Sequence, residues 1–129
     1  MFLSLDFLYL PAPDFEAALG FYTRVLGARV VWKVGGMGTV VARLELTEGR
    51  PALQLAEHLA GGGPILIYRA ADLAAAVAEL AGRGLPDGER LEIPHGPCHR
   101  FDAPGGQRFA VYELARPGVE AAWVGRIDP

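Results

Sequence analysis

The densest group of reactive side chains in this sequence is His95, Cys98 and His99. Imidazole and thiolate groups bind soft metal ions, so the spacing suggests a metal site. If 98–102 is a strand, however, Cys98 and His99 point to opposite faces and cannot hold the same ion. We therefore expect ordinary turn and strand structure here. The alternative is that His95 or His99 contacts a ligand, and no motif supports Cys98 as a nucleophile.

Charged residues also interrupt two predicted strands. Arg43 and Glu45 lie opposite the apolar stripe of residues 39–46. On the wall of a cleft, Arg43 would bind a carboxylate or phosphate; the alternative is an internal ion pair or a solvated rim. By strand alternation, Asp6 faces away from Phe7, towards a helix or the strand edge, which favours a structural role.

Four aromatic residues on the predicted strands are candidate cleft walls for a flat, apolar or aromatic ligand: Phe7, Tyr9, Trp32 and Tyr112. Aromatic side chains bind such ligands by stacking and by area burial. The alternative is plain core packing. The glycine-rich segments 35–38 and 104–107 do not connect a strand to a helix, so they predict hairpin turns rather than phosphate-binding loops.

Hydrophobic periodicity predicts the elements that must position these residues, and it predicts the same order twice. A helix begins after Asp14 with an apolar stripe that runs to Leu26, and another begins after Asp72. Period-two alternation and turn residues predict the strands. These strands cover 2–10, 28–34, 39–46, 51–57, 64–70, 90–94, 98–102 and 107–114.

The two helix caps, Asp14 and Asp72, lie 58 residues apart, and the same offset places Phe7 on Ile65. A repeat of this size indicates duplication of one βαβββ unit. We predict a single α+β domain in which two tandem modules form a curved mixed sheet around a cleft. The modules are 1–57 and 64–115, joined by a connector at 58–63. In the tail, 116–129, Trp123 is expected to pack back on the domain.

Composition narrows the range of functions. The chain has 129 residues, of which 51% are hydrophobic and 21% charged, as expected for one globular domain. A net charge of -3 without charge runs argues against nucleic-acid binding and against a polybasic membrane anchor. The single cysteine excludes an internal disulfide, and we expect neither a signal peptide nor a membrane span. We expect a cytoplasmic protein.

The stretch 8–27 resembles the first strand and helix of the vicinal oxygen chelate superfamily. That superfamily includes glyoxalase I, extradiol dioxygenases, fosfomycin-resistance enzymes and bleomycin-resistance proteins. Segments 70–84 and 104–114 are similar to the second helix and the final hairpin of that fold. The most specific match is the run Asp14, Phe15, Glu16, Phe21-Tyr22 and Leu26-Gly27. The resemblance implies the fold directly, but it implies little about activity because one fold carries many functions.

Enzymes of this superfamily place one metal ligand on the first and one on the last strand of each module. Carried over by position, these sites fall on Phe7, Gln54, Ile65 and Ala110. Phe7 and Ile65 have no ligating atom, and one neutral amide does not hold a divalent ion unaided. The resemblance therefore implies a protein without a metal or other cofactor, closest to the bleomycin-resistance branch.

We expect a small-molecule binding protein rather than an enzyme, possessing a cleft that sequesters an aromatic or hydrophobic compound, as in antibiotic resistance. Proteins of that branch are commonly dimers with clefts between subunits, so we also expect a homodimer. One alternative is a metal-dependent lyase, isomerase or dioxygenase with unexpected ligands such as Gln54, Glu57, His95 or Glu113. Another is an interaction module whose cleft is filled by its own side chains. The candidate ligand-binding residues are Phe7, Tyr9, Trp32, Arg43, Gln54, Ile65, His95, Ala110 and Tyr112.

Overall fold

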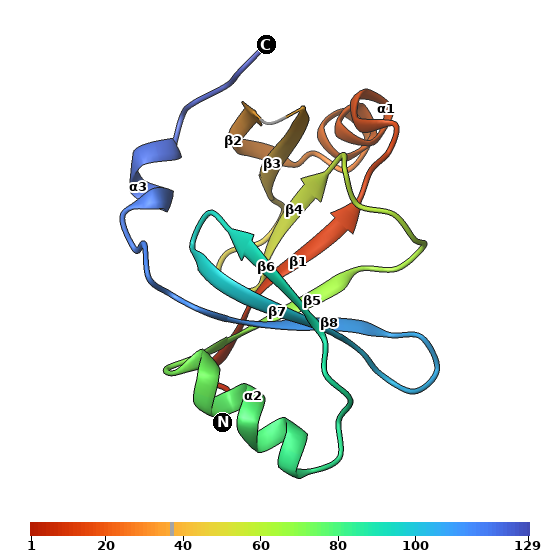
Figure 1. The fold of residues 1–129 in the computed structure, drawn as a ribbon. Helices are drawn as coiled ribbons and strands as arrows, with labels where there is room; N and C mark the ends of the chain where they lie inside the picture. The colour runs from red at the N-terminus through yellow and green to blue at the C-terminus, as the bar shows by residue number, and fades with distance from the viewer. Residues whose placement is uncertain (37) are drawn as a thin grey trace.

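The computed structural model describes residues 1–36 and 38–129; Met37, inside the predicted turn 35–38, lies outside the described residues. Two successive β-α-β-β-β sets are followed by a short helix in the tail (Figure 1). The first set is β1 (Ser4–Pro11), α1 (Phe15–Gly20) with the π-helical turn η1 (Phe21–Val25), β2 (Arg29–Gly36), β3 (Thr39–Glu45) and β4 (Ala52–Ala56). The second is β5 (Ile65–Ala70), α2 (Leu73–Gly82), β6 (Glu89–Ile93), β7 (Gly96–Asp102) and β8 (Arg108–Glu113), and the tail carries α3 (Val119–Trp123).

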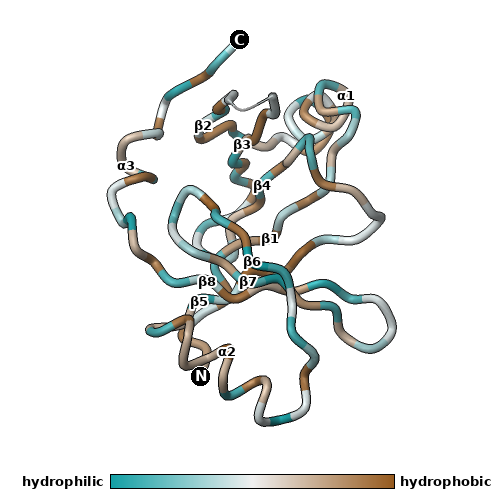
Figure 2. The backbone as a smooth tube through the Cα atoms, in the orientation of Figure 1, coloured by the Kyte–Doolittle hydropathy of each residue, from teal (hydrophilic) through white to brown (hydrophobic). Residues whose placement is uncertain are grey.

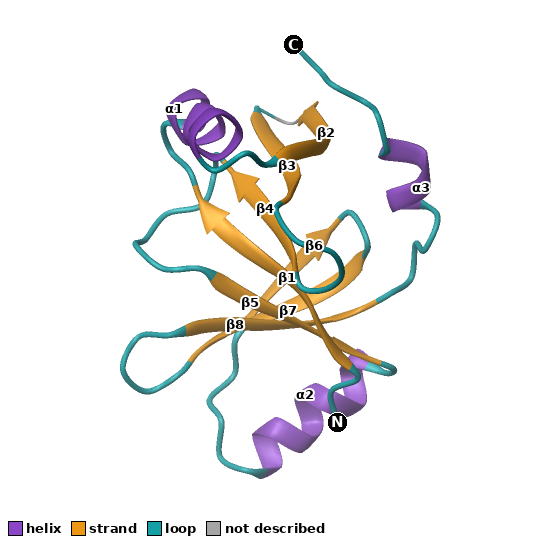
Figure 3. Cartoon of the chain, turned by 180° about the vertical axis from the view of Figure 1, so that it is seen from behind, coloured by secondary structure: helices purple, strands orange, loops and turns teal. Residues whose placement is uncertain are grey.

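The eight strands form one continuous curved sheet in the order β2-β3-β4-β1-β5-β8-β7-β6. Antiparallel pairing of β1 with β5 joins the two modules in the middle, while β1 with β4 and β5 with β8 are parallel pairs. Figure 3 shows the sheet from behind, with α1 and α2 at opposite ends and α3 set apart from both. The predicted α+β fold with two βαβββ modules is therefore confirmed.

Three apolar clusters hold this arrangement together. Phe15 and its neighbours on α1 pack against one half of the sheet, around Leu44 and Leu55. The corresponding cluster under α2 contains Phe101 and Val111. The third lies on the concave face, away from both helices, and includes Phe7 and Tyr112. Because side chains alternate along a strand, β4, β5, β7 and β8 each supply residues to an outer cluster and to the concave one. Apolar and polar stretches interleave along the strands in Figure 2.

Both predicted helix caps form. The Asp14 side chain accepts a hydrogen bond from the Ala17 amide, and Asp72 accepts one from Ala75. The predicted apolar stripe of the first helix is correct only in its first part. The chain widens into a π-helical turn after Gly20, which shifts the later residues around the axis. Val25 and Leu26 are consequently exposed rather than packed on the sheet.

None of the helices in the described residues has the length and apolarity needed to cross a membrane.

Candidate functional site

The predicted cleft residues meet on the concave face of the sheet. Phe7, Tyr9, Ile65, Ala110 and Tyr112 belong to one buried cluster. The Phe7 ring lies 5.6 Å from the Tyr112 ring and 4.6 Å from the His95 ring, measured between centroids. These side chains are at most 8% exposed, so the aromatic residues pack on one another as well as lining the concave face.

A row of side chains crosses the sheet at one level and links this cluster to the first module. Strand pairing places Trp32 opposite Arg43, Arg43 opposite Gln54, and Gln54 opposite Tyr9. Tyr9 in turn pairs with Ile65 on β5. The row runs from the edge strand β2 to β5 in the middle of the sheet. Its side chains are polar at Arg43 and Gln54 and apolar at Ile65.

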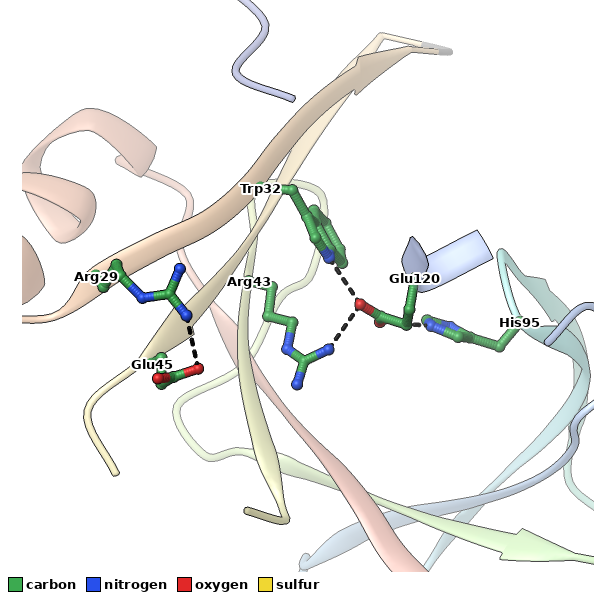
Figure 4. A network of polar contacts seen from close by, with 6 residues as sticks. All are labelled: Arg29, Trp32, Arg43, Glu45, His95 and Glu120. Atoms are coloured by element: carbon green, nitrogen blue, oxygen red, sulfur yellow. Dashed lines mark hydrogen bonds and ion pairs between the residues drawn. The ribbon is translucent and has the colours of Figure 1, made fainter. Parts of the chain in front are cut away.

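Glu120, on α3, lies at the polar end of this row and binds three of the predicted residues (Figure 4). Trp32 Nε1 donates to Glu120 Oε2 at 2.9 Å, and Arg43 Nη1 donates to the same oxygen at 2.6 Å. His95 Nε2 lies 2.8 Å from Oε1, which fits a ring proton on Nε2. Trp123, one turn further on, lies 5.0 Å from Trp32 in an edge-to-face contact, so the prediction that Trp123 packs back on the domain is confirmed.

The environment of Glu120 strongly favours its charged form. Partial burial alone would raise the pKa of this carboxyl group. The hydrogen bonds from His95, Trp32 and Arg43 outweigh that effect and lower the pKa from 4.5 to about 2. The carboxylate is therefore charged throughout the physiological pH range.

This pKa predicts a pH-dependent contribution of Glu120 to stability. Because the unfolded chain takes up the proton first, the contribution is complete above about pH 4.5 and is lost as the pH falls towards 2. Its full size is on the order of 3 kcal/mol. We expect the difference in unfolding free energy between wild type and Glu120→Gln, measured by urea denaturation, to shrink as the pH is lowered from 5 to 2.5. A difference that stays constant with pH would show that the charge is not held in this way.

Arg43 forms a partly buried ion pair and Glu45 an exposed one, which are the two alternatives stated from the sequence. Arg43 pairs with Glu120, and Glu45 pairs with Arg29 at 3.0 Å. Sequence reasoning missed Glu120 itself. It lies in a tail without clear periodicity, on a five-residue helix that has no side-chain cap.

Asp6 does not follow the predicted strand alternation. The pairing of β1 with β5 shifts register between Leu5 and Phe7, so Asp6 sits in a bulge. Its carboxylate accepts hydrogen bonds from Tyr112 Oη and from Arg50 Nη1. The prediction that Asp6 faces only a helix or the strand edge was therefore wrong, because a bulge changes the direction of the extra residue. The structural role expected for it agrees with these contacts.

Two of the hollows that border the second module lie beside β6 and β7, one on each face of the sheet. The inner one is a cavity of about 240 Å³ on the concave face, lined by Tyr9, Ile65, Ile67 and Ala110 together with residues of β6 and β7. Glu89, Glu92 and Arg100 supply its charged groups. The outer one, about 760 Å³, is an open groove between α2 and β6–β7. The inner cavity adjoins the apolar end of the row described above.

Cys98 and His99 point to opposite faces of β7, as predicted. Cys98 joins the concave cluster, whereas His99 stacks on Phe101 and lies 3.2 Å from Asp87. Burial raises the pKa of the Cys98 thiol to about 12. At pH 8 only about one molecule in ten thousand would carry the reactive thiolate.

We therefore expect Cys98 to react with a disulfide reagent such as DTNB at least about a hundredfold more slowly in the folded protein than in 6 M guanidinium. Stopped-flow absorbance at pH 8 measures both rates. Similar rates in the two conditions would contradict the burial of this thiol.

The residues present do not fit the metal site that the resemblance implies. Phe7, Ile65 and Ala110 offer no ligating side-chain atom at three of the four positions. The alternative metal ligands named from the sequence do not converge on one point either. The Glu113 carboxylate accepts a hydrogen bond from the Leu73 amide, whereas the His95 ring binds Glu120. Within residues 1–36 and 38–129, no three His, Cys, Asp or Glu side chains are grouped closely enough to hold a metal ion.

Solved structures with the same fold include enzymes. Methylmalonyl-CoA epimerase from Mycobacterium tuberculosis shares 20% identity, with a TM-score of 0.69 over 89% of this chain and 90% of the epimerase. A variant of the Streptomyces coelicolor epimerase in complex with 2-nitronate-propionyl-CoA shares 17% identity, with a TM-score of 0.68 over 89% and 96%. A hypothetical protein from Bacillus halodurans C-125 shares 16% identity, with a TM-score of 0.72 over 88% and 95%. These likenesses show the fold alone.

No curated protein gives a significant match to this sequence. The family comparison is decisive at a coarser level, because one family matches residues 4–122, almost the whole chain. The chain belongs to the Glyoxalase/Bleomycin resistance protein/Dioxygenase superfamily.

Proposed function

We propose that this protein binds a small organic molecule on the concave face of its sheet, without a metal ion. One observation carries the proposal. The four positions that correspond to metal ligands in the superfamily are Phe7, Gln54, Ile65 and Ala110. All four side chains are buried at the concave face of the sheet. Three of these side chains are apolar. A cleft with this lining favours an apolar or aromatic group over a cation.

The inner cavity gives that group a place. Its volume, about 240 Å³, exceeds that of an apolar cavity of about 150 Å³ known to bind benzene, which suits a single ring or a short hydrocarbon chain. Ile65, Ile67 and Ala110 form its floor, and Tyr9 forms the side nearest the polar row. This shape supports sequestration of an aromatic or hydrophobic compound, which needs no reactive group.

The metal-dependent alternative rests on fold likeness to methylmalonyl-CoA epimerases. The ligand positions in this chain do not support it, for the reasons of side-chain chemistry given above. The other alternative, a completely filled cleft, is favoured by the tight packing of Phe7 and Tyr112 but opposed by the cavity beside them.

Thermal-shift screening with small aromatic and apolar compounds tests the proposal. Ala110→Leu fills part of the inner cavity, whereas Ala74→Leu narrows the outer groove and serves as the matched control. We expect compounds that raise the melting temperature of wild type to do so in Ala74→Leu and to fail in Ala110→Leu. Shifts that survive Ala110→Leu but disappear in Ala74→Leu would move the site to the outer groove and overturn the proposal.

The cleft is lined by both modules of one chain, so ligand binding here needs no second copy. We keep the homodimer, the cytoplasmic location and a role in resistance as proposals. Sedimentation velocity tests the first of these: a dimer is expected, and a strictly monomeric particle would contradict it.

A further inference from the structure

The Glu120 carboxylate lies where hydrogen-bond donors from three other elements converge. Trp32 comes from β2, Arg43 from β3, and His95 from the turn between β6 and β7. All three donors belong to the two modules, and only the carboxylate comes from the tail. Two donor side chains are more deeply buried than the acid they bind: Trp32 is 0% exposed and the His95 side chain 3%, against 25% for Glu120.

The backbone that carries the three donors is held without help from Glu120. Trp32 and Arg43 are directly opposite each other in the β2–β3 pairing. The His95 carbonyl oxygen accepts hydrogen bonds from the amides of Ala115 and Arg116, which fixes its turn against the end of β8. Gly96 makes this close approach possible, because a Cβ there would overlap with the carbonyl oxygen of Glu113. The three donors therefore project from fixed backbone positions, which reduces the ordering that an incoming carboxylate would have to bring about.

Glu120 itself lies on a short segment of the tail that is held to the rest of the domain at both ends. Before it, the chain is held at the turn of His95; after it, the Gly125 amide donates to the Val31 carbonyl at 2.9 Å and the Asp128 amide to the Lys33 carbonyl at 2.8 Å. Helix α3, between these ends, has no buried residue. The Glu120 side chain can therefore turn away while the tail stays attached along β2.

Two further polar atoms beside this site have no partner. In the described part of the chain, the buried side-chain atoms without a hydrogen-bond partner are Gln54 Nε2 and His95 Nδ1. Gln54 is the neighbour of Arg43 in the row, and it is 1% exposed. Unsatisfied buried groups cost free energy, so they are rare unless a ligand or water completes them. A polar ligand group at this end of the cleft would give both atoms a partner, as an ordered water would.

We propose that Trp32, Arg43 and His95 form the carboxylate-binding end of the cleft, and that the ligand is an organic acid with an apolar or aryl body. In the unliganded protein the Glu120 carboxylate occupies this end, and the acid displaces it. This inference rests on the proposed function and names the ligand class for the same cleft.

The geometry of the row sets the size of the acid. Arg43 and Ile65 are three strands apart, which is about 14 Å at the usual strand spacing of about 4.8 Å. The Arg43 side chain covers part of this length. An aryl ring in the inner cavity would therefore be connected to the carboxylate by a few methylene groups.

Isothermal titration with matched acids and amides tests the inference. The probes are 3-phenylpropanoate, 4-phenylbutanoate and 5-phenylpentanoate, each with its neutral primary amide. We expect Glu120→Ala to bind the best acid about tenfold or more tightly than wild type does, because the internal competitor is gone. Affinity for the amides should not change. Glu120→Gln, which keeps the size of the side chain, should raise acid affinity in the same direction and guards against a folding defect in Glu120→Ala.

Adding Arg43→Gln to Glu120→Ala is expected to reduce acid affinity to that of the amide. Equal binding of acid and amide by every variant would overturn this inference and leave the proposed function standing. Binding of no acid by either Glu120 variant, while neutral compounds still shift the melting temperature through the inner cavity, would also overturn it. Loss of all binding, neutral compounds included, would instead be the failure of the proposed function.

Discussion

Replacing Trp32 by alanine is expected to lower the free energy of unfolding by about 4 kcal/mol, as for other fully buried large side chains. Trp32 is 0% exposed, packs edge-to-face on Trp123 and donates its indole N–H to Glu120. The substitution removes a large apolar volume and a hydrogen bond to a charged acceptor together. Urea denaturation at pH 7 measures the loss.

Two matched substitutions separate the contribution of the indole N–H from that of the packing between the two tryptophans. Trp32→Phe keeps an aromatic ring but not the N–H, and we expect it to cost about 2 kcal/mol. Trp123→Ala removes the more exposed partner, and about 1 kcal/mol is expected. If Trp32→Ala lowered the free energy of unfolding no more than Trp123→Ala does, the packing of α3 on the sheet would not depend on Trp32 in the way described.

Asp6→Ala is expected to cost about 3 kcal/mol, because it leaves buried polar groups without their acceptor. Asp6 is 3% exposed and accepts from Tyr112 Oη, from Arg50 Nη1 at 2.8 Å and from Ser4 Oγ at 2.6 Å. Burial and the bond to Asp6 raise the pKa of Tyr112, so its hydroxyl stays protonated and donates across the accessible pH range.

Asp102 is exposed, so Asp102→Ala is the control for Asp6→Ala. We expect it to change the free energy of unfolding by no more than about 0.5 kcal/mol. Tyr112→Phe should cost only about 1 kcal/mol, since Asp6 then keeps its two other partners. Urea denaturation of the three variants gives the comparison. An Asp6→Ala cost as small as that of Asp102→Ala would contradict the structural role of the bulge.

Much of the fold could be predicted from the sequence because its signals are local. Alternation along β3 separates Ala42 and Leu44 from Arg43, and the structure places Arg43 on the concave face accordingly. Asp14 and Asp72 cap their helices through the next-turn amides, which spacing alone reveals. Register across strands is a tertiary property, however, so the row from Trp32 to Ile65 could be expected only through the resemblance.

The missed features depend on departures from regular geometry. A π-helical turn exposes Val25 and Leu26, and a bulge turns Asp6 towards Tyr112; neither leaves a periodic signal. Glu120 was missed for another reason. Its partners are Trp32, Arg43 and His95, which lie 25 to 88 positions away along the chain, and nothing near Glu120 in the sequence indicates such contacts.

Native mass spectrometry tests the central claim, metal-free binding of a small molecule in the inner cavity, most directly. Tag-free protein incubated with 4-phenylbutanamide, a neutral probe, would be compared with Ala110→Leu under the same conditions. We predict one organic adduct per wild-type chain, none on Ala110→Leu, and no stoichiometric metal on either. One tightly held metal ion per chain, or equal organic adducts on both proteins, would contradict it.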